Sequence, residues 1–285
     1  MPQFRPNVCI VGLGLIGGSL SLALSKRGIR VTGYDQNRAV AAKALRRRAI
    51  SRSSGSIRDA VENADIVVVC VPVQMIASSV RKCLVHSKRG AVITDTGSVK
   101  AAIVRKIGLG PGRAEYIGGH PMAGTEKAGF DEASGDMFLN RVCILTPRPS
   151  VSSRALHMLR RMWSLAGART LVMTPAEHDR LVARISHLPH VIAIALMDYS
   201  IRGKANLRIA SGSFRDVTRV AASSPSMWQS IFEMNRKDLD RSITDFAAGL
   251  GNLRRAIRRG SRGSLGRILR KASNARIRLE RMGLR

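Results

Sequence analysis

Short runs of apolar, mostly β-branched residues alternate with longer amphipathic stretches between residue 7 and about residue 173. This alternation is typical of repeated strand-helix-strand units and predicts a mostly parallel sheet. The predicted strands are residues 8–11, 30–34, 66–70, 91–94, 115–117, 142–145 and 170–173. The predicted helices between them are residues 16–27, 38–47, 73–84, 99–106 and 152–165.

A strong helix start follows the last predicted strand. Thr174 as N-cap, Pro175 at the first helical position and Glu177 at the third form a capping box. Beyond it the pattern predicts helices only, from 175 towards 200, around 225–250 and from 265 to 282. We therefore expect an α/β fold, in which a doubly wound, mostly parallel sheet of the Rossmann type is followed by an all-α domain. The expected parts are residues 1–173, 174–250 and 251–285.

Composition narrows the class of protein. The 285 residues are 45% apolar and 24% charged, which is typical of a globular protein and excludes disorder and collagen. The longest purely apolar stretches are far shorter than the roughly 20 residues of a membrane helix, so no membrane partner is expected. Four widely spaced cysteines form no Cys-x-x-Cys pair and predict free thiols in the cytoplasm. The six histidines and these cysteines give no metal-ligand spacing, so no metal is expected.

Charge is the unusual property of the chain. Lys and Arg number 48 against 19 Asp and Glu, a net charge of +29. Residues 253–285 carry 12 basic side chains and the single acidic Glu280, and Gly260, Ser261, Gly263 and Ser264 indicate a flexible joint there. Such charge attracts polyanions and keeps a nucleic-acid or anionic-surface binding protein as an alternative. Against this, aromatic residues are 4% of the chain and residues 253–285 contain none that could stack on bases.

A glycine-rich turn follows the first predicted strand and opens a helix. It runs Gly12-Leu13-Gly14-Leu15-Ile16-Gly17. The first glycine suits a tight turn, the second lets backbone approach a pyrophosphate, and the third allows close packing of helix on strand. The amides of the helix N-terminus would then bind the phosphates. The motif in this context predicts a dinucleotide site.

Two further positions define the expected dinucleotide site. Asp35 ends the second predicted strand, 23 residues after Gly12, where a carboxylate binds ribose hydroxyls and favours NAD over NADP. Arg38 nearby fits either a phosphate contact or a solvated cation. Val71 and Pro72 end another strand and would bring backbone close to the nicotinamide, although the proline alone also explains the strand end.

Four later segments concentrate polar residues and glycine. They are residues 95–100, 118–127, 186–190 and 211–219. Together they offer a histidine, His120, on a strand-end loop, arginines able to hold carboxylates by two hydrogen bonds, and Ser98 as a helix N-cap beside the cofactor. This set of groups suits an alcohol dehydrogenase that acts on an anion.

In this order, these segments resemble the prephenate/arogenate dehydrogenases of tyrosine biosynthesis. The resemblance includes Ser19 after the glycine turn, residues 225–228 and Asn235, and it extends from about residue 7 to residue 250. It implies an NAD-binding domain at 1–173, a helical substrate and dimerisation domain at 174–250, and a basic helical extension at 251–285. It also implies a cytoplasmic homodimer that oxidises prephenate, arogenate or both by hydride transfer to NAD with loss of CO₂.

The resemblance also assigns expected roles to individual residues. His120 matches the histidine that hydrogen-bonds the C4 hydroxyl, and Ser98 matches a serine near both that hydroxyl and the nicotinamide. Arg219 matches the arginine that receives a substrate carboxylate, while Thr125 and Glu126 border the substrate. His187 is expected to line the site and His190 to pack in the core. Arg215 and Asp216 resemble an ionic gate, with a surface salt bridge as the alternative.

Two questions stay open at the level of sequence. A β-hydroxy acid dehydrogenase with a helical second domain is an alternative, although it leaves the His120 and Arg219 segments unexplained. The residues do not decide between prephenate and arogenate, which differ as a keto acid and an amino acid. After residue 250 too few residues remain for a regulatory domain of ordinary size, so we expect a monofunctional enzyme whose feedback control, where present, acts at the active site.

Overall fold

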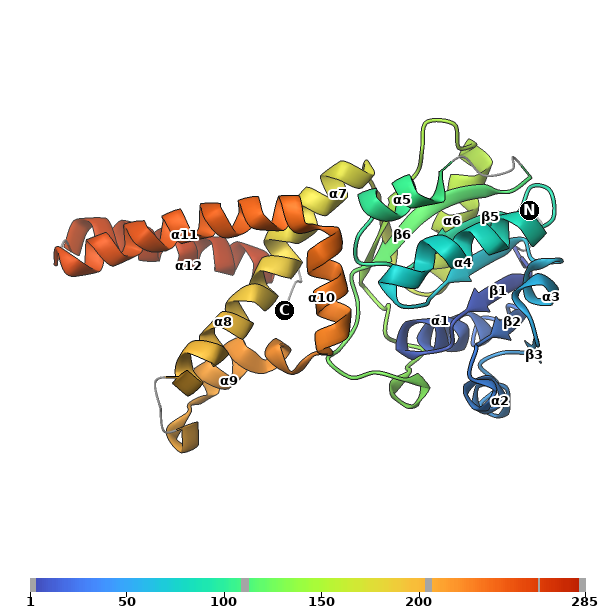
Figure 1. Ribbon diagram of the computed structural model, residues 1–285, viewed down its shortest axis with the longest axis horizontal. Coiled ribbons are helices and arrows are strands. Elements are labelled where there is room, and N and C mark those ends of the chain that lie inside the picture. Colours follow the sequence, from blue (N-terminus) through green and yellow to red (C-terminus); the bar gives the residue numbers. More distant parts are fainter. Residues whose placement is uncertain (1–3, 109–112, 203–206, 261, 282–285) are drawn as a thin grey trace. The chain divides into compact units, whose positions relative to one another are not determined.

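The computed structural model describes residues 4–108, 113–202, 207–260 and 262–281 (Figure 1). The chain divides into two compact units, Met1–Arg236 and Lys237–Arg285, and each is described by itself. The first unit contains the sheet and most of the helices. The second unit is helical.

An eight-stranded sheet organises the first unit, with strand order β3-β2-β1-β4-β5-β6-β7-β8. Only the β6–β7 pair is antiparallel among the strand pairs of the described residues. The bounds are β1 Val8–Val11, β2 Val31–Tyr34, β3 Arg52–Ser53, β4 Ile66–Val69, β5 Val92–Asp95, β6 Glu115–Pro121, β7 Val142–Thr146 and β8 Arg169–Val172. The first six strands have the order expected of a dinucleotide-binding sheet.

Helices cover both faces of the sheet because its strands are apolar on both sides (Figure 1). Along β1, Val8 and Ile10 join one buried cluster, while Cys9 and Val11 join the other. The first cluster also takes side chains from α1 (Leu15–Ser25), α2 (Arg38–Arg46) and α6 (Ser153–Leu165). The second takes side chains from α3 (Ile57–Val61), α4 (Val73–His86) and α5 (Ala101–Ile107).

The sheet confirms the predicted fold class and all seven predicted strands to within a few residues. The prediction for the sheet region missed β3, whose two residues are exposed, the five-residue α3 and the 3-10 helix η1 (Phe130–Glu132). The prediction that His120 lies on a strand-end loop is wrong. Strand β6 continues to Pro121 because its residues 118–121 pair with β7. His120 is therefore held by a sheet ladder.

Helices follow β8 within the first unit. They are α7 (Pro175–Val182), the π-helical turn η2 (Ala183–His187), α8 (Leu188–Arg202), η3 (Leu207–Ile209), α9 (Gly212–Thr218), η4 (Arg219–Ala222) and α10 (Pro225–Met234). The predicted capping box at Thr174 is present. The helix predicted from 175 towards 200 is interrupted by the wider turn η2, and such turns often occur at functional sites. Trp228 and Ile231 of α10 join the buried cluster beneath α4.

The run Pro175–Arg202 is long and apolar enough, by length and composition alone, to cross a membrane. It also contains the buried polar residues His178, Asp179 and His187. Several large apolar side chains of its second half are exposed in the single chain, among them Ile194, Tyr199 and Ile201. This run therefore combines buried polar side chains in its first half with exposed apolar side chains in its second half.

The second unit consists of α11 (Arg236–Arg258) and α12 (Arg262–Arg281). One helix was predicted around 225–250, but α10 ends at Met234 and α11 begins at Arg236, because Asn235 leaves the helical conformation and its side chain bonds elsewhere. The predicted joint is also shorter than expected. Gly260 ends a turn with φ of 59°, while Gly263 and Ser264 lie inside α12. Ser261 lies outside the described residues.

Candidate active site

The carboxyl ends of the parallel strands bring the predicted site residues to one edge of the sheet. Gly12 follows β1, Asp35 follows β2, Val71 follows β4, and Asp95 ends β5. His120 lies near the end of β6. Ligands of open α/β sheets bind at this edge. The geometry therefore gives one location for the cofactor and for the predicted catalytic histidine.

The glycine turn fits a dinucleotide. Gly12 has φ of 94°, and a Cβ on Gly17 would lie 1.9 Å from the carbonyl oxygen of Gly12, so both positions require glycine. A Cβ on Gly14 would meet nothing within 4 Å, which leaves open space beside the N-terminus of α1. No side chain of the described residues caps that N-terminus. Its amides and its partial positive charge are thus free to receive a pyrophosphate.

The Asp35 carboxylate is anchored beside the glycine turn. One oxygen accepts a hydrogen bond from the amide of Leu13 at 2.7 Å, and the other accepts one from the amide of Asn37 at 2.8 Å. Arg38 is exposed at the start of α2. Val71 is half-buried and Pro72 is the exposed N-cap of α4. These contacts hold an acidic group where the ribose of a bound NAD would lie.

A buried polar network joins the end of β5 to β6. The ammonium of Lys100 pairs with the carboxylate of Asp95, and both side chains are fully buried. Lys100 also donates to the carbonyl of Gly119 at 2.7 Å, and the hydroxyl of Tyr116 donates to Asp95 at 2.6 Å. Removing one partner of such a buried pair typically costs about 3–5 kcal/mol. The network fixes the segment that carries Ser98 against the strand that carries His120.

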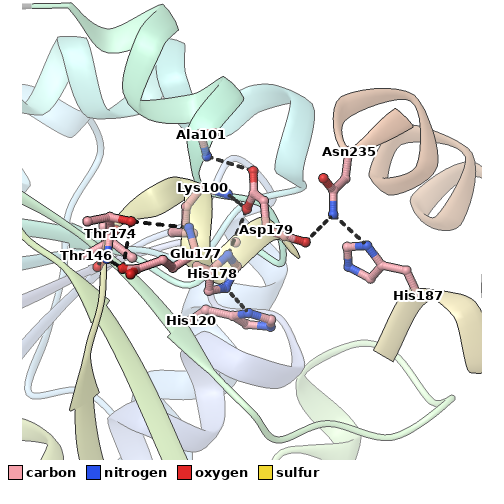
Figure 2. Close-up of polar contacts among 12 residues, drawn as sticks. Lys100, Ala101, His120, Thr146, Thr174, Glu177, His178, Asp179, His187 and Asn235 are labelled. Atoms are coloured by element: carbon pink, nitrogen blue, oxygen red, sulfur yellow. Dashed lines mark hydrogen bonds and ion pairs between the residues drawn. The ribbon is translucent and has the colours of Figure 1, made fainter. Parts of the chain in front are cut away.

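A chain of hydrogen bonds leads from His120 into α7 (Figure 2). Nδ1 of His120 lies 2.8 Å from Nε2 of His178, and Nδ1 of His178 lies 2.8 Å from Oδ1 of Asp179. The Asp179 carboxylate also accepts hydrogen bonds from the amides of Lys100 at 2.8 Å and Ala101 at 2.9 Å. All three side chains of this chain are buried.

The prediction that Ser98 is a helix N-cap is wrong. Helix α5 begins three residues later, at Ala101, and its N-cap residue Lys100 makes no side-chain cap. The carboxylate of Asp179 binds the first amides of α5 instead, so the cap comes from α7. Ser98 is half-buried. Its hydroxyl is therefore not needed to start the helix.

His187 and His190 flank the indole of Trp228. His190 stacks on Trp228 with ring centroids 3.5 Å apart, and His187 meets the same ring edge-on at 5.9 Å. The amide nitrogen of Asn235 lies 3.1 Å from Nδ1 of His187 and also donates to the backbone carbonyl of Asp179. Within the described residues, Nε2 of His187 is buried without a hydrogen-bond partner. A buried nitrogen of this kind is available to a ligand.

Arg219 forms an ion pair with Glu126 at 2.6 Å, which connects the start of η4 to the loop after β6. The side chain of Arg219 is 60% exposed and that of Glu126 is 33% exposed. Burial lowers the pKa of His190, and electrostatic repulsion from the positive charge of Arg219 lowers it further. Thr125 is exposed next to Glu126, while Arg215 and Asp216 lie exposed on α9. The structure thus brings Arg219, Glu126 and Thr125 together.

Burial keeps the histidines of the site neutral. It lowers the pKa of His120 well below the ordinary value of 6.5, and the charge of Lys100 adds to the effect. Burial likewise lowers the pKa of His178, although its bond to Asp179 acts in the opposite direction. The pKa of His187 falls to about 4, again mainly because of burial. Neutral imidazoles can accept a proton from a substrate at physiological pH.

Sequence reasoning missed His178, Asp179 and Tyr116. His178 and Asp179 directly follow Glu177 of the capping box, where they read as ordinary polar positions of a first helical turn. A signal was present nevertheless, because His178 and Val182 are four residues apart and so lie on one face of a helix, and the structure buries that face. Among the described residues, no group of three His, Cys, Asp or Glu side chains is placed to hold a metal ion.

Comparison with known proteins identifies the family. Residues 20–172 match the nucleotide-binding domain of prephenate dehydrogenase, and residues 174–271 match the dimerization domain of prephenate dehydrogenase. The chain belongs to the prephenate dehydrogenase family. It is therefore an NAD-dependent oxidoreductase with the dimerisation domain of that family. The two matches meet next to the capping box at Thr174, while the predicted domain bounds at 173 and 250 stay predictions.

Individual relatives cover most of the chain. A prephenate dehydrogenase of Bacillus subtilis is 36% identical over 85% of this chain and 67% of its own length. A cyclohexadienyl dehydrogenase of Zymomonas mobilis is 34% identical over 88% of both chains. The crystal structure of prephenate dehydrogenase from A. aeolicus in complex with hydroxyphenyl propionate and NAD+ has a TM-score of 0.88 at 31% identity, covering 98% of this chain and 100% of that one.

Replacement of Asp35 by Asn tests the cofactor site. The asparagine oxygen still accepts from Leu13, but the negative charge toward the ribose is lost. Since hydrogen bonds to charged groups contribute about 1.5–3 kcal/mol, we expect the Kd for NAD to rise about tenfold or more and discrimination against NADP to weaken. Titration of both cofactors, followed by protein fluorescence, measures this change. Asp136→Asn, which removes an exposed carboxylate elsewhere, is the control. Unchanged affinity in D35N would remove Asp35 from the site.

Proposed function

We propose that this protein oxidises prephenate, arogenate or both with NAD⁺ and releases CO₂, with His120 as the proton acceptor. The observation that carries the proposal is the placement of a buried, neutral histidine at the same sheet edge as the glycine turn. Family membership gives the reaction class. The residues of this site are then assigned by what each can do chemically.

The proposed reaction needs few groups because the substrate itself supplies much of the driving force. Bound NAD⁺ supplies the hydride acceptor for C4 of the cyclohexadienol ring. His120 takes the C4 hydroxyl proton as the hydride leaves, the bond to the ring carboxylate breaks, and its electron pair makes the ring aromatic. The proton returns from His120 to the phenolic oxygen, so the step balances. Aromatisation leaves the protein mainly the tasks of orientation and proton transfer.

The remaining site residues are assigned to substrate binding. Arg219 suits a carboxylate of the substrate, because a guanidinium can hold it by two hydrogen bonds, and the substrate would then compete with Glu126 for Arg219. Nε2 of His187, which is buried without a hydrogen-bond partner, is proposed to bind a polar group of the substrate. Thr125 and Arg215 are proposed to border the substrate, and Ser98 to contact its hydroxyl and the nicotinamide.

The exposed apolar residues of α8 fit a homodimer interface. They lie in the segment that matches the dimerization domain. A second copy of the chain would cover side chains that water contacts in the single chain. We propose a cytoplasmic homodimer, and we assign no nucleic-acid partner to its basic surface.

Steady-state assays with prephenate and arogenate test the proposed function, with His120→Asn as the decisive variant. Asparagine preserves a polar side chain but cannot accept the proton at Nε2. Since general acid–base catalysis contributes about 10²–10⁴-fold, we expect kcat to fall by that order while the Kd for NAD stays within about twofold. NADH formation at 340 nm measures turnover. A wild-type protein inactive on both substrates would overturn the proposal, and full turnover by H120N would remove His120 from the mechanism.

The pH dependence of kcat/KM follows from the lowered pKa of His120. The neutral imidazole is the active form, and it is lost only as pH falls through a pKa well below 6.5. We therefore expect kcat/KM to be constant from about pH 8 to 6.5 and to decline only below that range. Circular dichroism at each pH separates this decline from unfolding, because buried neutral histidines also destabilise the fold as they acquire protons. A decline centred at or above pH 6.5 would contradict the assignment.

Introduction of negative charge on α8 tests the proposed dimer. Ile194→Glu combined with Ile201→Glu places two carboxylates in the proposed interface, where desolvation disfavours them. We expect sedimentation equilibrium to give twice the chain mass for the wild type and a shift to the chain mass for the double variant. Val85→Glu changes an equally exposed apolar residue on α4 and is the control. A wild-type monomer, or an unchanged dimer in the double variant, would exclude this face.

A further inference from the structure

His178 and Asp179 lie behind His120, and neither has a role in the function proposed above. His178 is fully buried and Asp179 nearly so. They come from α7, which belongs to the helical region, whereas His120 belongs to the sheet. A buried histidine and a buried carboxylate aligned on a second histidine cost desolvation energy, and the cap that Asp179 gives to α5 does not account for His178.

The hydrogen bonds fix which nitrogen of each ring carries the proton. The Asp179 carboxylate accepts hydrogen bonds and donates none, so Nδ1 of His178 must be the donor in their 2.8 Å contact. In a neutral ring, Nε2 of His178 is then an acceptor. Since Nε2 of His178 accepts, Nδ1 of His120 must carry the proton and donate it in their 2.8 Å contact. Nε2 of His120 is left with a free lone pair.

Backbone amides fix Asp179 as a hydrogen-bond acceptor. Asp179 also accepts from the amides of Lys100 and Ala101, and amides donate only. Its carboxylate is therefore held in place by two backbone amides at the N-terminus of α5. In the described residues, the ring of His120 makes its hydrogen bond through Nδ1, to His178 (Figure 2), which leaves Nε2 for a substrate. Burial supports the same result, because it keeps both rings neutral.

We propose that His178 and Asp179 are positioning residues that hold His120 in the tautomer with the proton on Nδ1. The inference rests on the proposed function of His120 as proton acceptor. In the opposite tautomer Nε2 would carry a proton and could not accept one from the substrate hydroxyl. The arrangement follows the logic of the aspartate in a Ser-His-Asp triad, which orients a histidine without touching the substrate. Asp179 does the orienting here through an intervening histidine.

Two variants of His178 separate this role from a structural one. His178→Leu fills the space but offers no acceptor to Nδ1 of His120, whereas His178→Gln restores an acceptor oxygen at a similar reach. We expect kcat to fall about 10- to 100-fold in H178L and to recover most of that loss in H178Q, with the Kd for NAD unchanged in both. His157→Leu, at an exposed histidine of α6, is the control.

The ¹⁵N spectrum of histidine-labelled protein reads the tautomer directly and needs no substrate. In the wild type we expect a protonated Nδ1 and an unprotonated Nε2 for His120, assigned by loss of the signals in H120N. In H178L these signals should shift towards the opposite tautomer, and in H178Q they should not. A protonated Nε2 in the wild type, unchanged kcat in H178L, or equal losses in H178L and H178Q would overturn the inference. An inactive wild type with the expected spectrum would instead count against the proposed function alone.

Discussion

The carboxylate of Asp179 is the contact on which the site depends. It caps the N-terminus of α5 through two backbone amides, and it binds His178, which lies against His120. One side chain of the helical region thus supplies both the missing cap of a sheet-packed helix and the last link to the predicted catalytic base. Since buried carboxylates are stable only when their oxygens are satisfied, the two functions support each other. Loss of this contact would disturb helix start and histidine orientation together.

The charges of the buried network are balanced by the ion pair between Lys100 and Asp95. Lys100 brings a positive charge close to His120 and His178, and that charge favours neutral imidazoles. Asp95 compensates Lys100, and Tyr116 donates to the same carboxylate. The pKa of the Tyr116 hydroxyl is raised by burial and by Asp95, so it stays a hydrogen-bond donor. The net result is a buried site in which the histidines are neutral and can accept protons.

Local patterns were sufficient to predict the sheet, because its strands and helices have the expected apolar periodicity and the glycine turn has a fixed mechanical purpose. The same patterns could not show that α7 caps α5, since Lys100 and Asp179 are 79 residues apart in sequence. For this reason Ser98 was assigned a capping role that Asp179 performs. The break at Asn235 and the π-helical turn before His187 were equally hidden, because both depend on contacts between distant segments.

The packing of α10 against the sheet limits how the active site can open to substrate and product. Trp228 and Ile231 of α10 belong to the same buried cluster as residues of β1, β4 and α4, so the sheet and this part of the helical region share one core. Swinging the two apart like a hinge would expose that core to water. Binding of substrate and release of product are therefore expected to depend on small movements of the exposed segment 124–129, which carries Glu126.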